Sequence, residues 1–204
     1  MTTTLPLLFA LTALAYLIGS IPVAHLLCRS RGVDILAVGD GNPGAANVYR
    51  RVGRTAGVAV FALDASKGLI VVWVLPRVAG IPLDFSPILG AGALMGQWYP
   101  MFASFRGGVG LASAIGGGIG MLPAAGGIGL AIGAMSVIAT RSAEYAAAFG
   151  FASGVGASYF LGNDWVAVSG AVGLALLTFG RHIAVRAAAS APATVDAPGA
   201  VSGR

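Results

Sequence analysis

A glycine-rich stretch near the N-terminus carries the clearest chemical signal in this 204-residue sequence. Residues 39–51 read Gly-Asp-Gly-Asn-Pro-Gly-Ala-Ala-Asn-Val-Tyr-Arg-Arg. Glycines let a backbone approach a ligand closely, asparagine both donates and accepts hydrogen bonds, and arginine binds phosphate in a bidentate manner. The alternative is an ordinary glycine-rich loop. The stretch predicts a phosphate-ester site formed by Asp40, Gly41, Asn42, Gly44, Asn47 and Arg50.

A second candidate site follows at residues 105–110, which read Phe-Arg-Gly-Gly-Val-Gly. A cation and a run of glycines at the start of an apolar helix offer backbone N–H groups and a positive dipole end to an anion. A plain turn between helices with packing glycines is the alternative. The residues that we expect to bind a second phosphate are Arg106, Gly107, Gly108 and Gly110.

A third candidate site is the Arg181-His182 pair near the C-terminal end of the last apolar stretch. His182 is our one candidate catalytic group, because imidazole can donate to a phosphate or accept a proton. An interfacial cluster of cationic side chains is the alternative. His25 we interpret as interfacial. The sequence contains no Ser-His-Asp set, metal-ligand cluster or Walker motif, so we expect no metal and no cofactor.

Asp64 and Lys67 stand three residues apart within an apolar stretch and would share one face of a helix. Ionisable groups inside a membrane are costly, and they are usually functional or paired with one another. Both a functional pair and a mutually neutralising structural pair remain open from the sequence.

The amino-acid composition indicates which kind of secondary structure carries these candidate residues. Hydrophobic residues make up 57% of the chain and charged residues 9%, and mean hydropathy is +0.87. Soluble domains carry roughly 25% charged residues. The single Cys28 excludes a disulfide scaffold. We therefore expect an all-α, polytopic membrane protein. The net charge of +5 then reflects topology and contact with anionic lipids, and we predict no nucleic-acid partner.

Long apolar stretches predict about seven transmembrane helices, since each needs about 20 apolar residues. Residues 1–186 form a single membrane domain, and residues 187–204 a disordered cytoplasmic tail. The first span is expected to be retained, because residues 1–4 lack the basic residues of a signal peptide. The predicted spans are 5–28, 57–75, 86–101, 109–122, 124–139, 145–161 and 165–179.

The arginines predict the orientation of these spans. With the N-terminus outside and the C-terminus cytoplasmic, ten of the eleven arginines fall on the cytoplasmic side and only Arg77 outside. The fourth and fifth spans are short and meet at Pro123, so they could also form one kinked helix. That arrangement would leave six arginines inside and five outside, and the separate spans are therefore favoured. Glycines within the spans are interpreted as sites of close helix packing.

Together these segments resemble the bacterial membrane glycerol-3-phosphate acyltransferases that use acyl-phosphate donors, the PlsY family. The resemblance implies acyl transfer to the 1-hydroxyl of glycerol 3-phosphate, giving lysophosphatidate for phospholipid biosynthesis. Arg50 would hold a phosphate, Asn42 and Asn47 would shape the first loop, and His182 would complete the pocket. The matching residues are 16–22, 38–50, 63–68, 100–102, 105–110 and 181–182.

The same resemblance implies the surroundings of the protein. It places the chain in the bacterial plasma membrane, with its active site facing the cytoplasm. Its partners would be acyl phosphate, glycerol 3-phosphate and the lipid bilayer. It also admits a soluble enzyme that supplies acyl phosphate.

Departures from the family pattern leave other functions open. Asp40, Gln97, Val109 and Val185 stand where the family usually has serine, histidine, lysine and asparagine. Asp40 would repel a phosphate by about 4 kcal/mol at about 4 Å and an effective dielectric near 20, unless a neighbouring arginine neutralises it. One alternative is a paralogue with lost or altered acyl transfer. Another is a small transporter or channel, suggested by the Asp64–Lys67 pair and the interrupted fourth and fifth spans.

Overall fold

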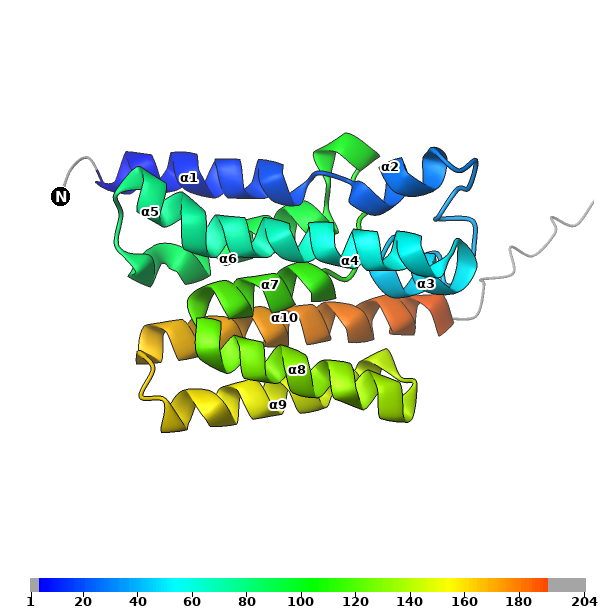
Figure 1. Ribbon diagram of the computed structural model, residues 1–204. Helices are drawn as coiled ribbons and strands as arrows, with labels where there is room; N and C mark the ends of the chain where they lie inside the picture. The colour runs from blue at the N-terminus through cyan, green and yellow to red at the C-terminus, as the bar shows by residue number, and fades with distance from the viewer. Residues whose placement is uncertain (1–3, 191–204) are drawn as a thin grey trace, which may run out of the picture.

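The computed structural model describes residues 4–190, and its regular structure is entirely helical, as predicted (Figure 1). Short connections join helices whose axes lie roughly along one common line, with successive helices such as α7 and α8 running in opposite senses. A π-helical turn at Ile70–Val74 joins α4 to α5, and short 3₁₀ turns occur at Leu83–Phe85 and Met101–Ala103. The α-helices are α1 (Thr4–Gly19), α2 (Val23–Arg29), α3 (Ala45–Arg51), α4 (Arg54–Leu69), α5 (Leu75–Ala79), α6 (Ser86–Trp98), α7 (Leu111–Met121), α8 (Pro123–Thr140), α9 (Ala143–Phe160) and α10 (Trp165–Ser190).

Four helical stretches among the described residues are long and apolar enough to cross a membrane. They are Leu5–Arg29, Arg54–Ala79, Pro123–Thr140 and Trp165–Ala187. The first two combine shorter elements, since α1 and α2 are separated at Pro22 and α4 continues through the π-helical turn into α5. The Leu111–Met121 helix is apolar but shorter.

The fourth and fifth predicted spans are separate helices. Leu122 leaves helical geometry, with φ −131° and ψ 71°, and Pro123 begins α8. Proline is tolerated at the first position of a helix but not within it. Figure 1 shows α7 and α8 running in opposite directions. The start of α1 and the end of α10 lie at opposite ends of the bundle (Figure 1).

The last helix extends further than the sequence indicated. We expected the tail to begin at residue 187, whereas α10 continues to Ser190. Its final turns are rich in alanine, which has the highest helix propensity of all residues. The rest of the predicted tail, residues 191–204, lies outside the described residues.

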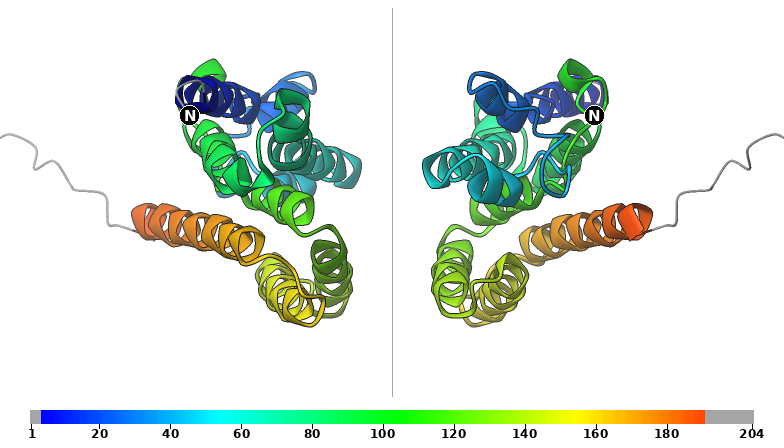
Figure 2. Two further views of the ribbon diagram at one scale, coloured as in Figure 1. Left: turned by 90° about the vertical axis from the view of Figure 1, so that its left-hand side faces the viewer. Right: turned by 90° about the vertical axis from the view of Figure 1, so that its right-hand side faces the viewer.

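Glycines mark the places where helix backbones come closest. A Cβ at Gly116 of α7 would overlap the backbone of Ala65 in α4, and one at Gly96 of α6 would overlap Tyr16 in α1. Gly129 and Gly150 lie at the contact between α8 and α9. Figure 2 shows α8 and α9 as a pair set apart from α1 and α6. Small residues permit such close packing in membranes, and these glycines serve that purpose.

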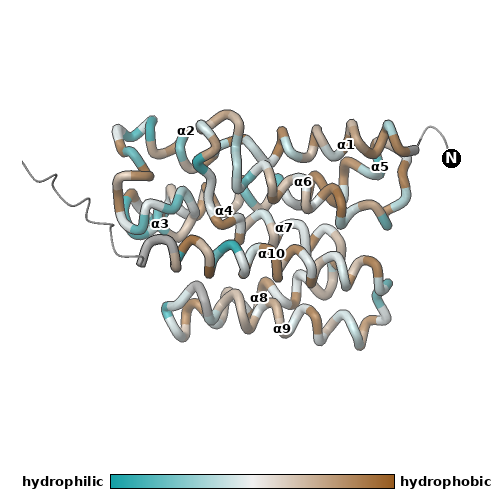
Figure 3. The backbone as a smooth tube through the Cα atoms, turned by 180° about the vertical axis from the view of Figure 1, so that it is seen from behind, coloured by the Kyte–Doolittle hydropathy of each residue, from teal (hydrophilic) through white to brown (hydrophobic). Residues whose placement is uncertain are grey.

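The polar part of the chain gathers where the candidate site is expected. Figure 3 shows hydrophilic segments in α2, α3 and the connection between them. That connection includes the glycine-rich stretch at residues 39–44. The fold thus separates an apolar helical body from a polar end that carries the candidate phosphate-binding loop.

Candidate functional site

Asn47 fixes the shape of the first loop. Its side chain is buried, and Nδ2 donates to the carbonyl oxygens of Val38 at 2.9 Å and Asn42 at 3.1 Å. Gly39 has φ +66°, and a Cβ there would overlap the Asn47 side chain. Asn47 therefore holds the loop closed from its position in α3, and Gly39 permits the tight turn.

Asp40 is neutralised by one of the arginines considered from the sequence. Arg50 Nη2 lies 3.0 Å from Asp40 Oδ2, and both side chains are about half exposed, at 55% and 52%. The other carboxylate oxygen of Asp40 accepts a hydrogen bond from the Asn42 backbone N–H at 3.1 Å. The loop thus carries an ion pair on its surface, and the arginine predicted to hold phosphate is engaged by a carboxylate of its own chain.

The two glycine-bearing segments meet. A Cβ at Gly108 would lie 3.1 Å from Asn42 Oδ1 and 3.2 Å from the carbonyl oxygen of Pro43. The Gly108 N–H donates to the Gln97 backbone oxygen at 3.2 Å, which ties the second loop to the end of α6. Residues 105–110 therefore lie directly against the first loop, as a shared binding site requires.

The rest of the second loop is held by the end of α6. A Cβ at Gly107 would overlap the backbone of Gln97, so only glycine fits there. Trp98 Nε1 donates to the Val109 carbonyl oxygen at 2.8 Å. Gly110 has φ +87° just before α7 begins, a backbone conformation that favours glycine. Packing explains why glycine occurs at position 107, and the positive φ explains glycine at position 110, independently of the predicted role in binding.

A small, partly open hollow lies where these loops meet the break between α1 and α2. Of the residues predicted for the site, Gly107 and Gly108 line it, together with Pro43 from the first loop. Its remaining lining residues are Gly19, Ile21, Pro22, Val23, Ala24, His25, Gln97 and Pro100.

His25 lies in this hollow although the sequence suggested only an interfacial position. Its Nε2 is buried and has no hydrogen-bond partner within the described part of the chain. The available signal was an imidazole three residues after Pro22, at the polar end of an apolar span. That pattern does not reveal that residues 97–108 fold over the same point.

The Arg181-His182 segment of α10 contacts Tyr99, the residue that follows α6. Arg181 Nη1 is 3.3 Å from the Tyr99 hydroxyl, and the guanidinium carbon is 5.0 Å from the centroid of the Tyr99 ring. His182 is half-buried, and its side chain makes no hydrogen bond with the side chains and backbone that the structure describes. Neither His182 nor the exposed Arg106 lines the hollow. The structure therefore joins the two glycine loops and leaves these predicted site residues outside the hollow.

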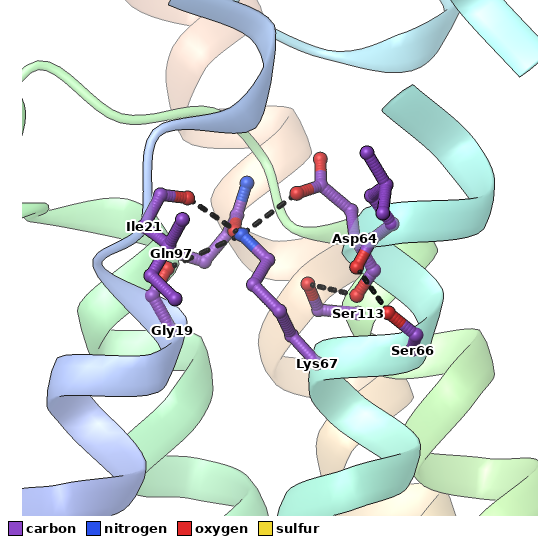
Figure 4. Close-up of polar contacts among 8 residues, drawn as sticks. Gly19, Ile21, Asp64, Ser66, Lys67, Gln97 and Ser113 are labelled. Carbon is purple, nitrogen blue, oxygen red and sulfur yellow. Dashed lines mark hydrogen bonds and ion pairs between the residues drawn. The ribbon is translucent and has the colours of Figure 1, made fainter. Parts of the chain in front are cut away.

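Asp64 and Lys67 form a buried ion pair next to the hollow (Figure 4). Lys67 Nζ lies 2.7 Å from Asp64 Oδ1, and the side chains are 7% and 4% exposed. The same ammonium contacts Gln97 Oε1 at 2.6 Å and the carbonyl oxygen of Ile21 at 2.9 Å. Asp64 and Lys67 are thus paired, and Lys67 also contacts the break between α1 and α2 and the end of α6.

Comparison with known proteins gives a consistent result. Residues 9–188 match the family model described as glycerol-3-phosphate acyltransferase. A glycerol-3-phosphate acyltransferase of Geobacter sulfurreducens is 47% identical over 113 residues, which cover 55% of this chain and 58% of that protein. Glycerol-3-phosphate acyltransferase 5 of Dehalococcoides mccartyi is 35% identical over 184 residues, covering 87% of this chain and 78% of that protein.

A solved structure agrees with the fold. The crystal structure of PlsY, an integral membrane glycerol 3-phosphate acyltransferase in its glycerol 3-phosphate form, has a TM-score of 0.77 and 29% sequence identity. That match covers 87% of this chain and 88% of the other. The alignments with the Geobacter relatives span less than two thirds of those proteins, 58% and 59% of their lengths.

Proposed function

Because the chain belongs to the glycerol-3-phosphate acyltransferase family, we propose that it transfers an acyl group from an acyl phosphate to the 1-hydroxyl of glycerol 3-phosphate. The products are lysophosphatidate and inorganic phosphate, and the reaction serves phospholipid biosynthesis. The alcohol oxygen bonds to the acyl carbon while the bond from that carbon to the phosphate oxygen breaks. The electron pair leaves with the phosphate, and the hydroxyl proton goes to the departing phosphate.

The observation that carries this proposal is the meeting of the two glycine loops. Gly108 lies against Asn42 and Pro43, and both loops border one hollow at the polar end of the apolar helices. The two substrates each carry a phosphate, and the donor also carries an acyl chain that is soluble in lipid. Two adjacent loops next to the membrane-spanning body suit such a pair.

Little covalent chemistry is required of the protein. An acyl phosphate is a mixed anhydride with a good leaving group, so positioning and stabilisation of phosphate charge can lower much of the barrier. We assign phosphate binding to Arg50, with Arg106 and the Gly107–Gly108 backbone at the second phosphate. Arg50 must release Asp40 to do so, because the two form an ion pair at 3.0 Å.

The arginines support a location for the site. Arg29, Arg50 and Arg51 belong to α2 and α3 at one end of the bundle, and Arg77 belongs to α5 at the other (Figure 1). Cytoplasmic segments of membrane proteins carry the excess of basic residues. We propose that the chain makes seven crossings of the bacterial plasma membrane, with the N-terminus outside and the site facing the cytoplasm. A soluble enzyme can then deliver acyl phosphate from that side.

The proposal is tested with purified protein, palmitoyl phosphate and labelled glycerol 3-phosphate. We expect labelled lysophosphatidate and an equal amount of inorganic phosphate, each dependent on both substrates. Arg50→Ala should lower kcat/KM at least about tenfold, because it removes a charge-assisted contact worth roughly 1.5–3 kcal/mol. Palmitoyl-CoA as donor is the matched control and should give no product. Absence of product, under conditions where a PlsY enzyme is active, would contradict the proposal.

The Asp40–Arg50 ion pair favours one alternative function, that of a paralogue with lost or altered acyl transfer. Its test is the double variant Asp40→Ser/Val109→Lys, which restores the family's hydroxyl and cation. A gain of activity from an inactive wild type would support the alternative. High wild-type activity without any gain would count against it. The features that suggested a transporter have structural explanations, since α7 and α8 are separate helices and Lys67 contacts Asp64.

A further inference from the structure

Lys67 occupies an unusual place for an ammonium group. The residue is 5% exposed and its Nζ contacts oxygens from three separate segments. Besides Asp64 Oδ1 at 2.7 Å, these are Gln97 Oε1 at 2.6 Å and the carbonyl oxygens of Ile21 at 2.9 Å and Gly19 at 3.4 Å. One side chain of α4 thus joins the break between α1 and α2 to the end of α6 (Figure 4).

The break between α1 and α2 leaves the Gly19 carbonyl without a backbone donor, because the Val23 N–H bonds to the Ile21 carbonyl instead. Proline has no backbone N–H, and α1 ends at Gly19 before α2 starts at Val23. In the apolar interior of a membrane protein, carbonyl groups released by such a break must find another partner. The Lys67 ammonium supplies hydrogen bonds to Gly19 and Ile21.

The groups that Lys67 joins are walls of the hollow. Gly19, Ile21 and Gln97 all line it, and the Gln97 backbone oxygen receives the N–H of Gly108 from the opposite glycine loop. Lys67 itself is not among the lining residues. It can therefore affect substrates only through the placement of the groups that it holds.

Burial of an ion pair is a weak source of stability, because apolar residues of similar volume often stabilise a core equally well. A geometric role accounts better for a lysine that contacts two walls of one hollow. On the basis of the proposed function, we propose that Lys67 is a positioning residue, which holds the α1–α2 break and the end of α6 at the separation that acyl transfer requires. Small errors in the placement of reacting groups lower the rate strongly.

The test uses the full chain with the double variant Lys67→Met/Asp64→Asn. Lys67→Met alone would leave the Asp64 carboxylate buried without its partner, which by itself strongly destabilises a fold. The double variant removes both charges and keeps the side-chain sizes close. Ser113→Ala is the matched control, because the Ser113 hydroxyl donates to the Asp64 backbone oxygen at 3.0 Å and Ser113 is not a lining residue of the hollow.

Two readouts distinguish positioning from general stability. In folded protein, the double variant should lower kcat about tenfold to hundredfold, with KM for glycerol 3-phosphate changed less than about threefold. Cys28 is the chain's single cysteine and is buried in α2, beyond the break. Its labelling rate with a small thiol reagent should rise about fivefold or more. Ser113→Ala should lower the unfolding temperature while kcat and Cys28 labelling stay at wild-type values.

The outcomes separate this proposal from the proposed function. Unchanged Cys28 labelling in the double variant would overturn the positioning role, whatever the activity. So would a kcat within twofold of the wild type. A wild-type chain without acyltransferase activity would overturn the proposed function alone. Labelling of Cys28 would then still decide whether Lys67 holds the break, since that readout needs no substrate.

Discussion

At the scale of single residues, Asp40 sets the availability of Arg50. The two side chains form an ion pair at 3.0 Å that is about half exposed. Exposed pairs of this kind are worth roughly 0–1 kcal/mol, so a substrate phosphate can displace Asp40 at a modest cost. If Arg50 binds phosphate as proposed, the pair should reduce affinity for phosphate without abolishing it, and Asp40 should also repel a bound phosphate directly.

Replacement of Asp40 should consequently improve substrate binding. We expect Asp40→Asn to lower KM for glycerol 3-phosphate by about two- to fivefold, which corresponds to the worth of an exposed ion pair. Steady-state kinetics at fixed ionic strength measures this change. Asp34→Asn is the control, because Asp34 lies in the same connection and its side chain accepts only the Leu36 N–H. An equal KM would contradict the competition between Asp40 and phosphate, and a higher KM for Asp40→Asn would show that Asp40 helps to bind the substrate.

Single residues also show where sequence reasoning ends. Asp64 and Lys67 are three apart on one helix, so their pairing follows from helical periodicity. Contacts of Lys67 with Gln97 and Ile21 join positions 30 and 46 apart, and no local pattern encodes them. The position of His25 in the hollow could not be predicted for the same reason. Its chemical environment comes from loops far along the chain that fold over it.

At the scale of elements, the helices follow from composition and their ends from proline and glycine. The predicted spans 57–75 and 124–139 correspond to the α4–α5 stretch and to α8, whose ends lie near those limits. The break at Pro22 was missed within the first predicted span, because its flanks are apolar on both sides. The length of an apolar stretch indicates a membrane span. It does not reveal a break in the helix whose free carbonyl groups accept hydrogen bonds from a side chain of another helix.

The contact between α4 and α7 depends on glycine. A Cβ at Gly116 would overlap the backbone of Ala65, which cannot move as a flexible side chain can. We expect Gly116→Ala to destabilise the protein by about 1–3 kcal/mol, the usual effect of overpacking. Thermal unfolding in detergent, followed by circular dichroism, measures it.

Gly118 provides the matched control on the same helix. Nothing lies within 4 Å of the position that its Cβ would take, so alanine fits there. Gly118→Ala should be neutral or stabilising by up to about 1 kcal/mol, since alanine favours the helix. Equal effects of the two substitutions would contradict close packing of α4 against α7.

At the scale of the whole molecule, the scarcity of charged residues in the helices contrasts with the polar glycine loops at one end of the bundle. Large apolar side chains remain exposed along the helices, for example Phe9 at 76%, Ile138 at 78% and Phe160 at 87%. Lipid is the solvent that suits such a surface, whereas the polar loops gather at the α2–α3 end (Figure 3). This division supports the proposal that the polar loops face water while the body of the protein lies in the bilayer.

The orientation of the molecule follows from this division and can be measured. In a Cys28→Ala background, Ser30→Cys lies after the first helical pass and Asp164→Cys lies between α9 and α10. An impermeant thiol reagent should label residue 30 only from the cytoplasmic side and residue 164 only from the outside, because arginines gather near Ser30. The helical passes between the two positions are α4–α5, α6, α7, α8 and α9, so separate α7 and α8 segments place them on opposite sides. Labelling of both from one side would contradict seven crossings and would require α7 and α8 to cross together as one.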